Sequence, residues 1–190
     1  RQMCIRDSYY MGWAYLQSGD RDKAVKAFAD GAADCPDFVF PNRLEAVLAL
    51  NAAIELNPDD AHARHYLGNL YYDKRQYDLA QPHWEEAARL NSSFPTTWRN
   101  LALVYYNKRN DAPKALQAME KAFSLDESDA RVLMELDQLY KKLQRPHAER
   151  LAFLQNYPDL IEQRDDLVLE EITLLNQCGK YKEAKQKLDA

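Results

Sequence analysis

A period of 34 to 35 residues constrains this chain more than any other feature of its sequence. Aromatic, small and bulky residues recur at this period in three series that stay in register. The series are Tyr71, Tyr105, Tyr140 and Leu175; Gly68, Ala102, Asp137 and Ile172; and Trp84, Met119, Phe153 and Leu188. Residues 9–28 carry an earlier copy with Gly12, Tyr15, Gly19, Ala24 and Phe28 at the same internal offsets. Self-similarity at a fixed period of this length indicates a stacked array of one repeated unit.

The spacing inside one period predicts two helices of about 14 residues each, because apolar residues recur at steps of three or four. Gly68 and Ala80 stand where two helix backbones would approach closely, and Tyr71 and Trp84 would fill the space beside them. The polar residues 73–76 would form the tight turn of the helix pair. One pair cannot bury its apolar face alone, so we expect the pairs to stack.

This pattern resembles the tetratricopeptide repeat (TPR), whose signature is W-x2-L-G-x2-Y followed by Ala, an aromatic residue and Pro. Residues 61–94 match at Leu67, Gly68, Tyr71, Ala80, Trp84 and Ala87, with Arg64 in place of the Trp. Residues 95–129 match at Trp98, Leu101, Tyr105, Ala115 and Ala122, with one extra residue in the turn. The resemblance implies an all-α fold, a right-handed superhelical solenoid of antiparallel helix pairs.

Two later copies complete the array. In residues 130–164, Leu136 and Tyr140 fit the signature, but Asp137 and Glu149 replace small residues, so we expect looser packing there. Residues 165–190 give a truncated copy with Gly179, Tyr181 and Ala184. The expected domain is one TPR array over residues 9–190, with repeats at 9–37, 38–60, 61–94, 95–129, 130–164 and 165–190.

The repeat at 38–60 is shortened, because Pro36 and Pro58 both close a repeat but are only 22 residues apart. Residues 42–57 supply a second helix, and the first helix of that pair is missing. An extended two-proline connector, residues 35–42, stands in its place. We expect Phe38 and Phe40 to fill the space that the lost helix would occupy.

The two ends of the sequence suggest a fragment. Residues 1–8 resemble translated sequencing-adapter read-through, as found at the ends of proteins assembled from metagenomic reads, so we expect the packed array to begin at Tyr9. The repeat order resembles bacterial proteins in which a TPR array follows a β-rich domain of unknown function. That resemblance implies a covalently linked N-terminal domain.

Charge and composition limit the partners. The formal net charge is −5 and the pI is about 5.4, which argues against general attraction to nucleic acid or to an anionic membrane. No run approaches the roughly 18 apolar residues that cross a bilayer. Cys4, Cys35 and Cys178 are widely separated and odd in number. Free thiols in a reducing compartment are therefore favoured, and we expect a cytoplasmic protein.

The TPR resemblance implies that the first helices of the repeats line a concave wall that binds a protein or peptide partner. The candidate groove residues on this wall are His65, Asn69, Tyr72, Arg99, Asn100, Tyr106 and Arg131. Tyr71, Tyr77 and Trp84 fall on packing positions. For Tyr72 and Tyr106, ligand contact and ordinary solvent exposure both remain open.

Some TPR proteins bind a terminal carboxylate with Lys, Asn, Asn, Lys and Arg on successive first helices. By position, His65 stands for the first Lys, Asn69 and Asn100 for the two Asn, and Arg131 for the second Lys. Two cations and two amides in one groove would suit a carboxylate. Glu135 replaces the last Arg and would weaken such a clamp, and Asn at these positions is also common in TPRs that bind no carboxylate.

No residue pattern indicates catalysis, a metal or a cofactor. His62 and His65 could share a metal, but no carboxylate or Cys is placed to complete the site, so two exposed groove imidazoles are the simpler expectation. The five glycines are spread singly, without a phosphate-binding loop. We therefore expect a non-catalytic binding scaffold. The alternative is a helical accessory region of a larger, possibly carbohydrate-related enzyme.

Overall fold

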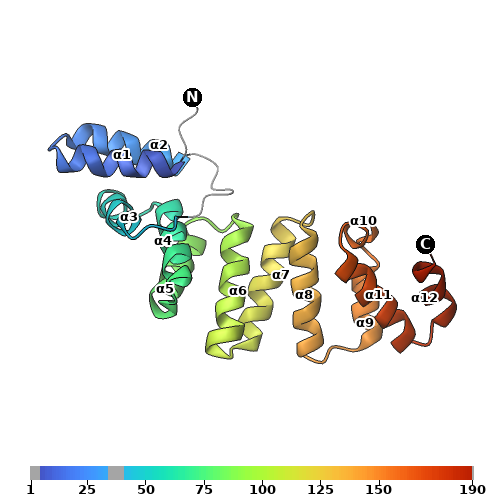
Figure 1. The fold of residues 1–190 in the computed structure, drawn as a ribbon. Coiled ribbons are helices and arrows are strands. Elements are labelled where there is room, and N and C mark those ends of the chain that lie inside the picture. The colour runs from blue at the N-terminus through green and yellow to red at the C-terminus, as the bar shows by residue number, and fades with distance from the viewer. Residues whose placement is uncertain (1–4, 34–40, 190) are drawn as a thin grey trace. The chain divides into compact units, whose positions relative to one another are not determined.

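A computed structural model describes residues 5–33 and 41–189 of the chain. These residues form twelve helices and no strand, which confirms the all-α prediction (Figure 1). The helices are α1 (Ile5–Gln17), α2 (Arg21–Ala33), α3 (Glu45–Leu56), α4 (Ala61–Asp73), α5 (Tyr77–Leu90), α6 (Pro95–Arg109), α7 (Ala112–Leu125), α8 (Ala130–Lys142), α9 (His147–Leu154), α10 (Pro158–Ile161), α11 (Asp165–Gln177) and α12 (Tyr181–Leu188). None of them is long and apolar enough to span a membrane.

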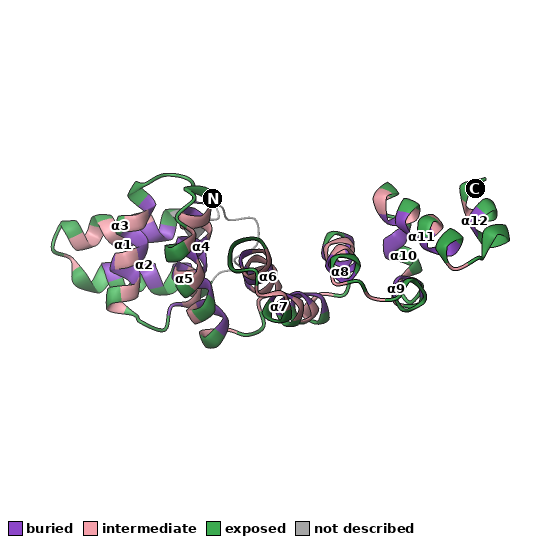
Figure 2. Cartoon of the chain, turned by 90° about the horizontal axis from the view of Figure 1, so that it is seen from below, coloured by how far each residue is buried: buried purple, intermediate pink, exposed green. Residues whose placement is uncertain are grey.

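The chain divides into two compact units, residues 1–104 (unit 1) and residues 105–190 (unit 2). In unit 1, α1 packs on α2 and α3, and α4 packs on α3 and α5. In unit 2, α8 packs on α7 and α9, and α11 packs on α9, α10 and α12. Buried residues lie on the sides of the helices that face their neighbours (Figure 2). Stacked helix pairs therefore build the core of each unit, as the period predicts.

Glycine allows two close helix contacts in unit 1. A Cβ atom added to Gly68 would lie 2.4 Å from the Trp84 ring, and one added to Gly12 would lie 2.5 Å from the Phe28 ring. Trp84 and Phe28 are each 2% exposed. The recurring pair of a glycine and a large ring is thus a packing contact in which the ring occupies the place of the missing side chain.

One residue in each helix-pair turn has left-handed backbone geometry. These residues are Gly19, Arg75, Asn110, Gln144 and Gly179, with φ between 52° and 82°. A buried alanine follows five residues later in four of the turns, at Ala24, Ala80, Ala115 and Ala184. The turn thus sets which residue of the second helix faces the first.

The third full repeat departs from this spacing. Its turn contains Pro146, and Arg150, six residues after Gln144, takes the buried position, while Glu149 is exposed. Asp137 is 0% exposed and binds Arg150. A buried ion pair fills the space that small residues fill elsewhere, and α8 and α9 contact each other much less extensively than α4 and α5 do, which agrees with the looser packing predicted at residues 130–164.

Aspartate residues cap four of the helices, and the first of these caps is Asp20, which accepts from the backbone N–H of Lys23 in α2. The carboxylates of Asp60, Asp111 and Asp129 accept hydrogen bonds from backbone N–H groups in the first turns of α4, α7 and α8. Asp60 is 2% exposed and also accepts a 3.0 Å hydrogen bond from the hydroxyl of Tyr9 in α1. This cap therefore ties two helix pairs of unit 1 together.

The start of the packed array also differs from the prediction. Helix α1 begins at Ile5, and Ser8 is 1% exposed. Ser8 packs closely on α2, since a Cβ atom added to Gly31 would lie 3.3 Å from the Cβ atom of Ser8. The packed array therefore starts before Tyr9, while the adapter origin of residues 1–8 stays a prediction. Within residues 41–60, α3 is the single helix, as expected. Phe38, Phe40, Cys4 and Cys35 lie outside the described residues.

Candidate functional site

A hydrogen-bond network connects α4, α5 and α6 in unit 1 at the predicted groove positions. The Oδ1 atom of Asn69 accepts from Trp84 Nε1 and from Asn100 Nδ2, each at 3.0 Å. Asn69 Nδ2 lies 2.8 Å from His65 Nε2, and His65 Nδ1 lies 2.9 Å from Thr97 Oγ1. The structure thus brings three of the candidate groove residues, His65, Asn69 and Asn100, into one internal hydrogen-bond network.

The donors in this network determine the proton position on His65. The indole N–H of Trp84 can only donate, so the oxygen of Asn69 must face it and the Asn69 amide nitrogen must face His65. His65 Nε2 then accepts, and Nδ1–H donates to Thr97. His65 is 2% exposed, and burial, with a smaller contribution from His62, lowers its pKa to about 3. The imidazole is therefore neutral at physiological pH.

These facts correct the predicted role of His65. It was expected as an exposed imidazole in the groove and as the first cation of a carboxylate clamp. His65 is buried and neutral, and both of its ring nitrogens are hydrogen-bonded, so it is neither an exposed groove residue nor a cation for a carboxylate. Asn69, half-buried, uses its oxygen twice and its nitrogen once inside the protein. Both residues stabilise the α4–α6 contact.

Tyr72 lies beside this network and is half-buried. Its ring makes an edge contact with Tyr77 at a centroid distance of 5.1 Å and a tilted contact with Trp84 at 5.4 Å. Trp84 is buried, as predicted, whereas Tyr77 is half-buried. Tyr71, also half-buried, stacks on His83. Tyr72 is thus partly a packing residue whose remaining surface is held in one orientation.

The remaining candidates differ in exposure. Arg99 and Asn100 are half-buried in α6. In unit 2, Tyr106 is half-buried, and Lys142 Nζ lies 4.8 Å from its ring centroid. Arg131 is exposed and forms a 3.2 Å ion pair with Glu135, the residue that reverses the clamp charge. With His65 neutral and Arg131 paired, neither predicted cation supports a carboxylate clamp.

We call Asn69, Tyr72, Arg99 and Asn100 the first-helix surface of unit 1. Asn100 donates one N–H to Asn69, and the described residues give its Oδ1 atom no partner. The oxygen and the second N–H of the Asn100 amide are therefore left for a ligand, and the bond to Asn69 fixes their orientation.

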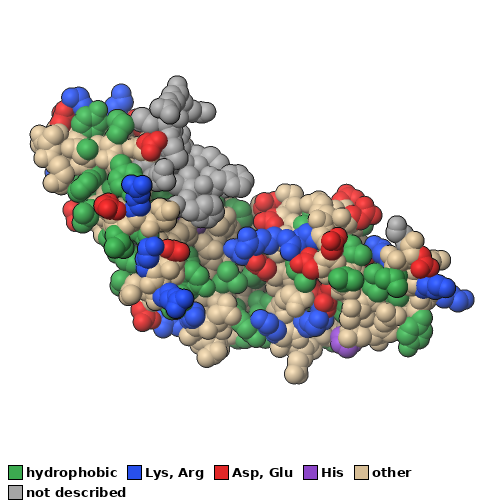
Figure 3. Space-filling model, in the orientation of Figure 1, with side chains coloured by type: hydrophobic (Ala, Val, Ile, Leu, Met, Phe, Trp, Pro, Cys, Tyr) green, Lys and Arg blue, Asp and Glu red, His purple; other side chains and the backbone are tan. Residues whose placement is uncertain are grey.

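Acidic and basic side chains are interspersed on the face of the molecule that Figure 3 shows.

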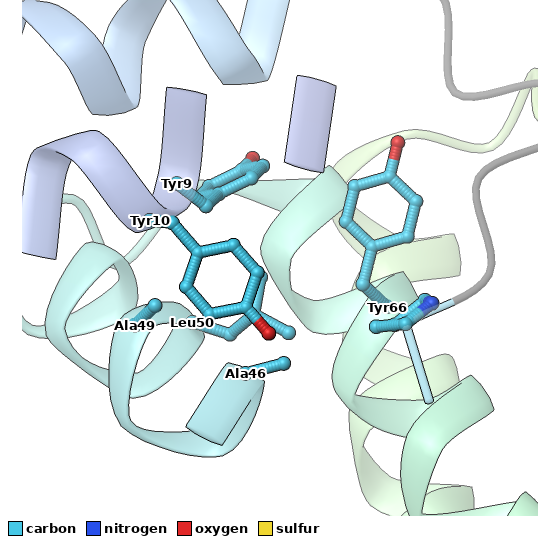
Figure 4. Close-up of a pocket in the computed structure, with 7 residues that line it drawn as sticks. Tyr9, Tyr10, Ala46, Ala49, Leu50 and Tyr66 are labelled. Carbon is cyan, nitrogen blue, oxygen red and sulfur yellow. The ribbon is translucent and has the colours of Figure 1, made fainter. Parts of the chain in front are cut away.

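An apolar pocket lies elsewhere in unit 1, between α1, α3 and α4. Tyr9, Tyr10, Ala46, Ala49, Leu50 and Tyr66 line it together with Pro41 (Figure 4). Its free volume is about 10 Å³, which is the room that a single water molecule needs. This pocket is therefore too small to hold a ligand in the present arrangement.

A buried cluster of charged side chains in unit 2 was not anticipated. Arg150 Nε and Nη2 donate to the two carboxylate oxygens of Asp137 at 3.0 and 2.6 Å, and Nη2 also donates to Glu170 at 2.7 Å. Lys141 Nζ donates to Glu170 at 2.9 Å. The buried position follows the left-handed turn residue by one residue more in the α8–α9 pair than in the other helix pairs. An alignment of the repeats that allows for this extra residue places Asp137 and Arg150, which carry opposite charges, at facing positions, and this is the signal that could have identified the pair.

The pKa values of the two carboxylates in this cluster are shifted in opposite directions. Burial raises the pKa of Asp137 despite the Arg150 bonds. Burial also acts to raise the pKa of Glu170, but bonds from Lys141 and Arg150 outweigh it and hold this pKa below its usual range. In the part of the chain that the structure describes, no group of His, Cys, Asp and Glu side chains is arranged to hold a metal ion.

Comparison with known proteins agrees with this architecture. A TPR repeat model matches residues 68–108, and a tetratricopeptide repeat model matches residues 49–81. Superkiller complex protein 3 of Mus musculus is 27% identical, over a region covering 63% of this chain and 9% of that protein.

Two solved structures share the fold. Pseudomonas aeruginosa pilF has a TM-score of 0.63 and 21% identity, covering 97% of this chain and 74% of that chain. YrrB, described as a TPR protein with an unusual peptide-binding site, has a TM-score of 0.65 and 18% identity, covering 93% of this chain and 89% of that chain. The matches to residues 49–108 and the fold shared with these structures support the tetratricopeptide repeat family for this chain.

Proposed function

We propose that this chain is a non-catalytic scaffold whose first-helix surface in unit 1 binds an extended peptide segment of a partner protein. TPR proteins are commonly protein-interaction scaffolds, and the similar structure YrrB is described as having a peptide-binding site. The observation that carries the proposal is the amide of Asn100. Its oxygen and its second N–H match the N–H and C=O groups that an extended peptide backbone presents.

The neighbours of Asn100 suit the same ligand. Tyr72 is held by Tyr77 and Trp84, so its ring loses little conformational freedom when a peptide side chain packs on it. Aromatic and arginine side chains often dominate binding energy at protein interfaces, and Tyr72 and Arg99 supply one of each. An oriented amide, a fixed aromatic ring and an arginine on these first helices are therefore suitable groups for recognising a peptide.

The binding surface can be tested with peptides selected from a random phage-displayed library on the immobilised chain. The selected peptides are synthesised with a fluorophore and titrated against a variant carrying Tyr72→Ala, Arg99→Ala and Asn100→Ala. We expect affinity to fall at least about 100-fold, since each position carries a central contact. Circular dichroism and urea unfolding establish that the variant is folded.

A control variant carries Arg89→Ala and Tyr181→Ala, which remove one exposed arginine and one exposed tyrosine outside this surface. Its affinity should equal that of the unmodified chain. Peptides that bind the triple variant as tightly as the unmodified chain would refute the proposal.

The neutral character of His65 and the ion pair of Arg131 lead to a second expectation. Each peptide should bind equally well as the free acid and as the C-terminal amide, because no charged clamp recognises its terminus. A tenfold preference for the free acid would support the clamp instead. The contribution of Tyr106 stays a prediction.

The alternative function also stays a prediction. The chain spans 9% of the length of the mouse relative, and the activity of a longer protein is a separate proposal. A helical accessory region of a possibly carbohydrate-related enzyme, with a linked β-rich N-terminal domain, is tested by determining the coding sequence upstream of Tyr9. A β-rich domain encoded there supports it, and a further TPR repeat contradicts it.

A further inference from the structure

A surface pocket of about 320 Å³ lies in unit 2, outside the first-helix surface. Its lining residues come from the end of α8, the turn into α9 and the end of α11. The lining residues are Lys141, Gln144, Arg145, Pro146, His147, Arg150 and Gln177. They include three cationic side chains and no carboxylate. The volume is in the lower part of the range of small-ligand sites.

Arg150 is the most buried of the lining residues, at 2% exposed. Its Nε and Nη2 atoms are bound by Asp137 and Glu170. The described residues give Nη1 no hydrogen-bond partner. This buried guanidinium is therefore fixed in place and has one nitrogen left to donate to a ligand in the pocket.

Lys141 and Arg145 add positive charge at the rim. Lys141 pairs with Glu170, and Arg145 lies 3.5 Å from Glu120 and over the Tyr140 ring, 4.2 Å from its centroid. These contacts restrict both side chains, and each retains N–H donors beyond those it uses. The paired carboxylates do not line the pocket, so an anion inside it contacts cationic and neutral groups, although these carboxylates offset part of the positive charge.

The first turn of α9 provides backbone donors at the same place. In α4, α7 and α8 an aspartate caps the first turn, whereas the N-cap of α9 is Pro146, which has no capping side chain. The first backbone N–H groups of α9, on His147 and Ala148, are left without such a cap. Such groups and the positive end of the helix dipole favour an anion.

We propose that this pocket binds a phosphate dianion, either as the free ion or as a phosphate monoester. Donors reach the pocket from a buried guanidinium, two further cationic side chains and a helix N-terminus, and these directions suit the several oxygens of a tetrahedral anion. The pocket is larger than a bare phosphate requires, so a monoester with a small organic group can enter.

The proposal is tested by titrating the ¹⁵N-labelled chain with inorganic phosphate, with N-acetyl-phosphoserine amide and, at equal ionic strength, with sodium chloride. We expect saturable shifts of the His147 and Ala148 amide signals with both phosphate compounds and not with chloride. Tighter binding of the monoester identifies a phosphorylated ligand, and tighter binding of inorganic phosphate identifies the free ion. Either result supports the site.

Gln177→Glu is the matched variant, because it places a carboxylate on the pocket wall at an exposed side chain. We expect it to weaken phosphate binding about tenfold or more, either by repelling the dianion or by pairing with Arg145. Gln186→Glu makes the same change on the exposed surface of α12, outside the lining, and should leave binding unchanged. Equal shifts in chloride and phosphate, or unaltered binding by Gln177→Glu, would overturn the proposal.

Discussion

Arg150 occupies the position at which four other helix pairs bury an alanine, and Asp137 faces it across α8 and α9. Both charges are almost inaccessible to water, with side-chain exposures of 2% and 0%. A buried ion pair adds little net stability compared with apolar packing, because both partners lose hydration, but removing one partner leaves a costly charge. The pair therefore makes this repeat depend on residues that the other repeats lack.

Arg150→Ala should lower the free energy of unfolding by about 3–5 kcal/mol, because Asp137 would remain buried without a counter-charge. The double variant Asp137→Ala/Arg150→Ala should lose less than Arg150→Ala alone, since Glu170 retains Lys141. Urea unfolding of the three proteins measures both quantities. A loss below about 1 kcal/mol in Arg150→Ala would mean that the pair is open to water in solution.

His65 makes stability depend on pH. Its pKa is lowered from 6.5 to about 3 in the folded chain, so between these values the unfolded chain binds a proton that the folded chain does not. Stability should therefore fall as the pH falls through this window. The contribution between pH 7 and pH 5 is roughly 2 kcal/mol.

Urea unfolding at several pH values tests this prediction. His65→Gln should remove most of the change between pH 7 and pH 5, and the control His147→Gln, at an exposed side chain, should retain it. The same pH dependence in His65→Gln as in the unmodified chain would show that other groups cause it.

Within the helix pair, the approach of α4 and α5 depends on the absence of a side chain at residue 68. The place of that side chain is taken by the Trp84 ring, which also donates to Asn69. One contact thus determines the distance between the two helices and the orientation of the Asn69 amide within the first-helix surface. A repeat that has a larger residue at the position of Gly68 needs a residue smaller than tryptophan at the position of Trp84.

Gly68→Ala should destabilise the chain by about 1–3 kcal/mol, because the added methyl group forces the Trp84 ring to move. Adding Trp84→Leu should restore part of the loss relative to the two single changes, which a double-mutant cycle in urea detects. Purely additive losses would show that the two residues do not meet.

On the scale of the whole molecule, helices within each unit contact their neighbours in sequence, so the stability of a unit is approximately a sum of local contributions. The core residues of unit 1 connect α1 to α4, and the charged cluster of unit 2 connects α8, α9 and α11. Each cluster stabilises the helices that supply its side chains.

Hydrogen exchange of Arg150→Ala should therefore increase first in α8, α9 and α11, while α1–α5 exchange as in the unmodified chain. Mass spectrometry of peptic fragments resolves this difference. Equal acceleration in α2 and α9 would indicate that the chain unfolds as one cooperative unit.

The sequence alone determined the repeat period, the all-α class and the recurring contact between a glycine and a large ring. Those features depend on local spacing, because residues three or four apart share a helix face whatever the remainder of the chain does. The aspartate caps and the polar turns are local in the same way, since each depends on residues within a few positions of the helix end.

Only the tertiary structure decided the state of His65, the partners of Asn69 and the ion pair of Arg150. The sequence predicts a groove cation at His65, because its position on α4 does not reveal that Thr97 of α6 covers it. Arg150 became buried because the turn containing Pro146 shifts α9 by one residue, which periodicity counted from Glu149 could not show. Burial and protonation depend on which helix lies opposite, and that is set by packing between repeats rather than by spacing within one.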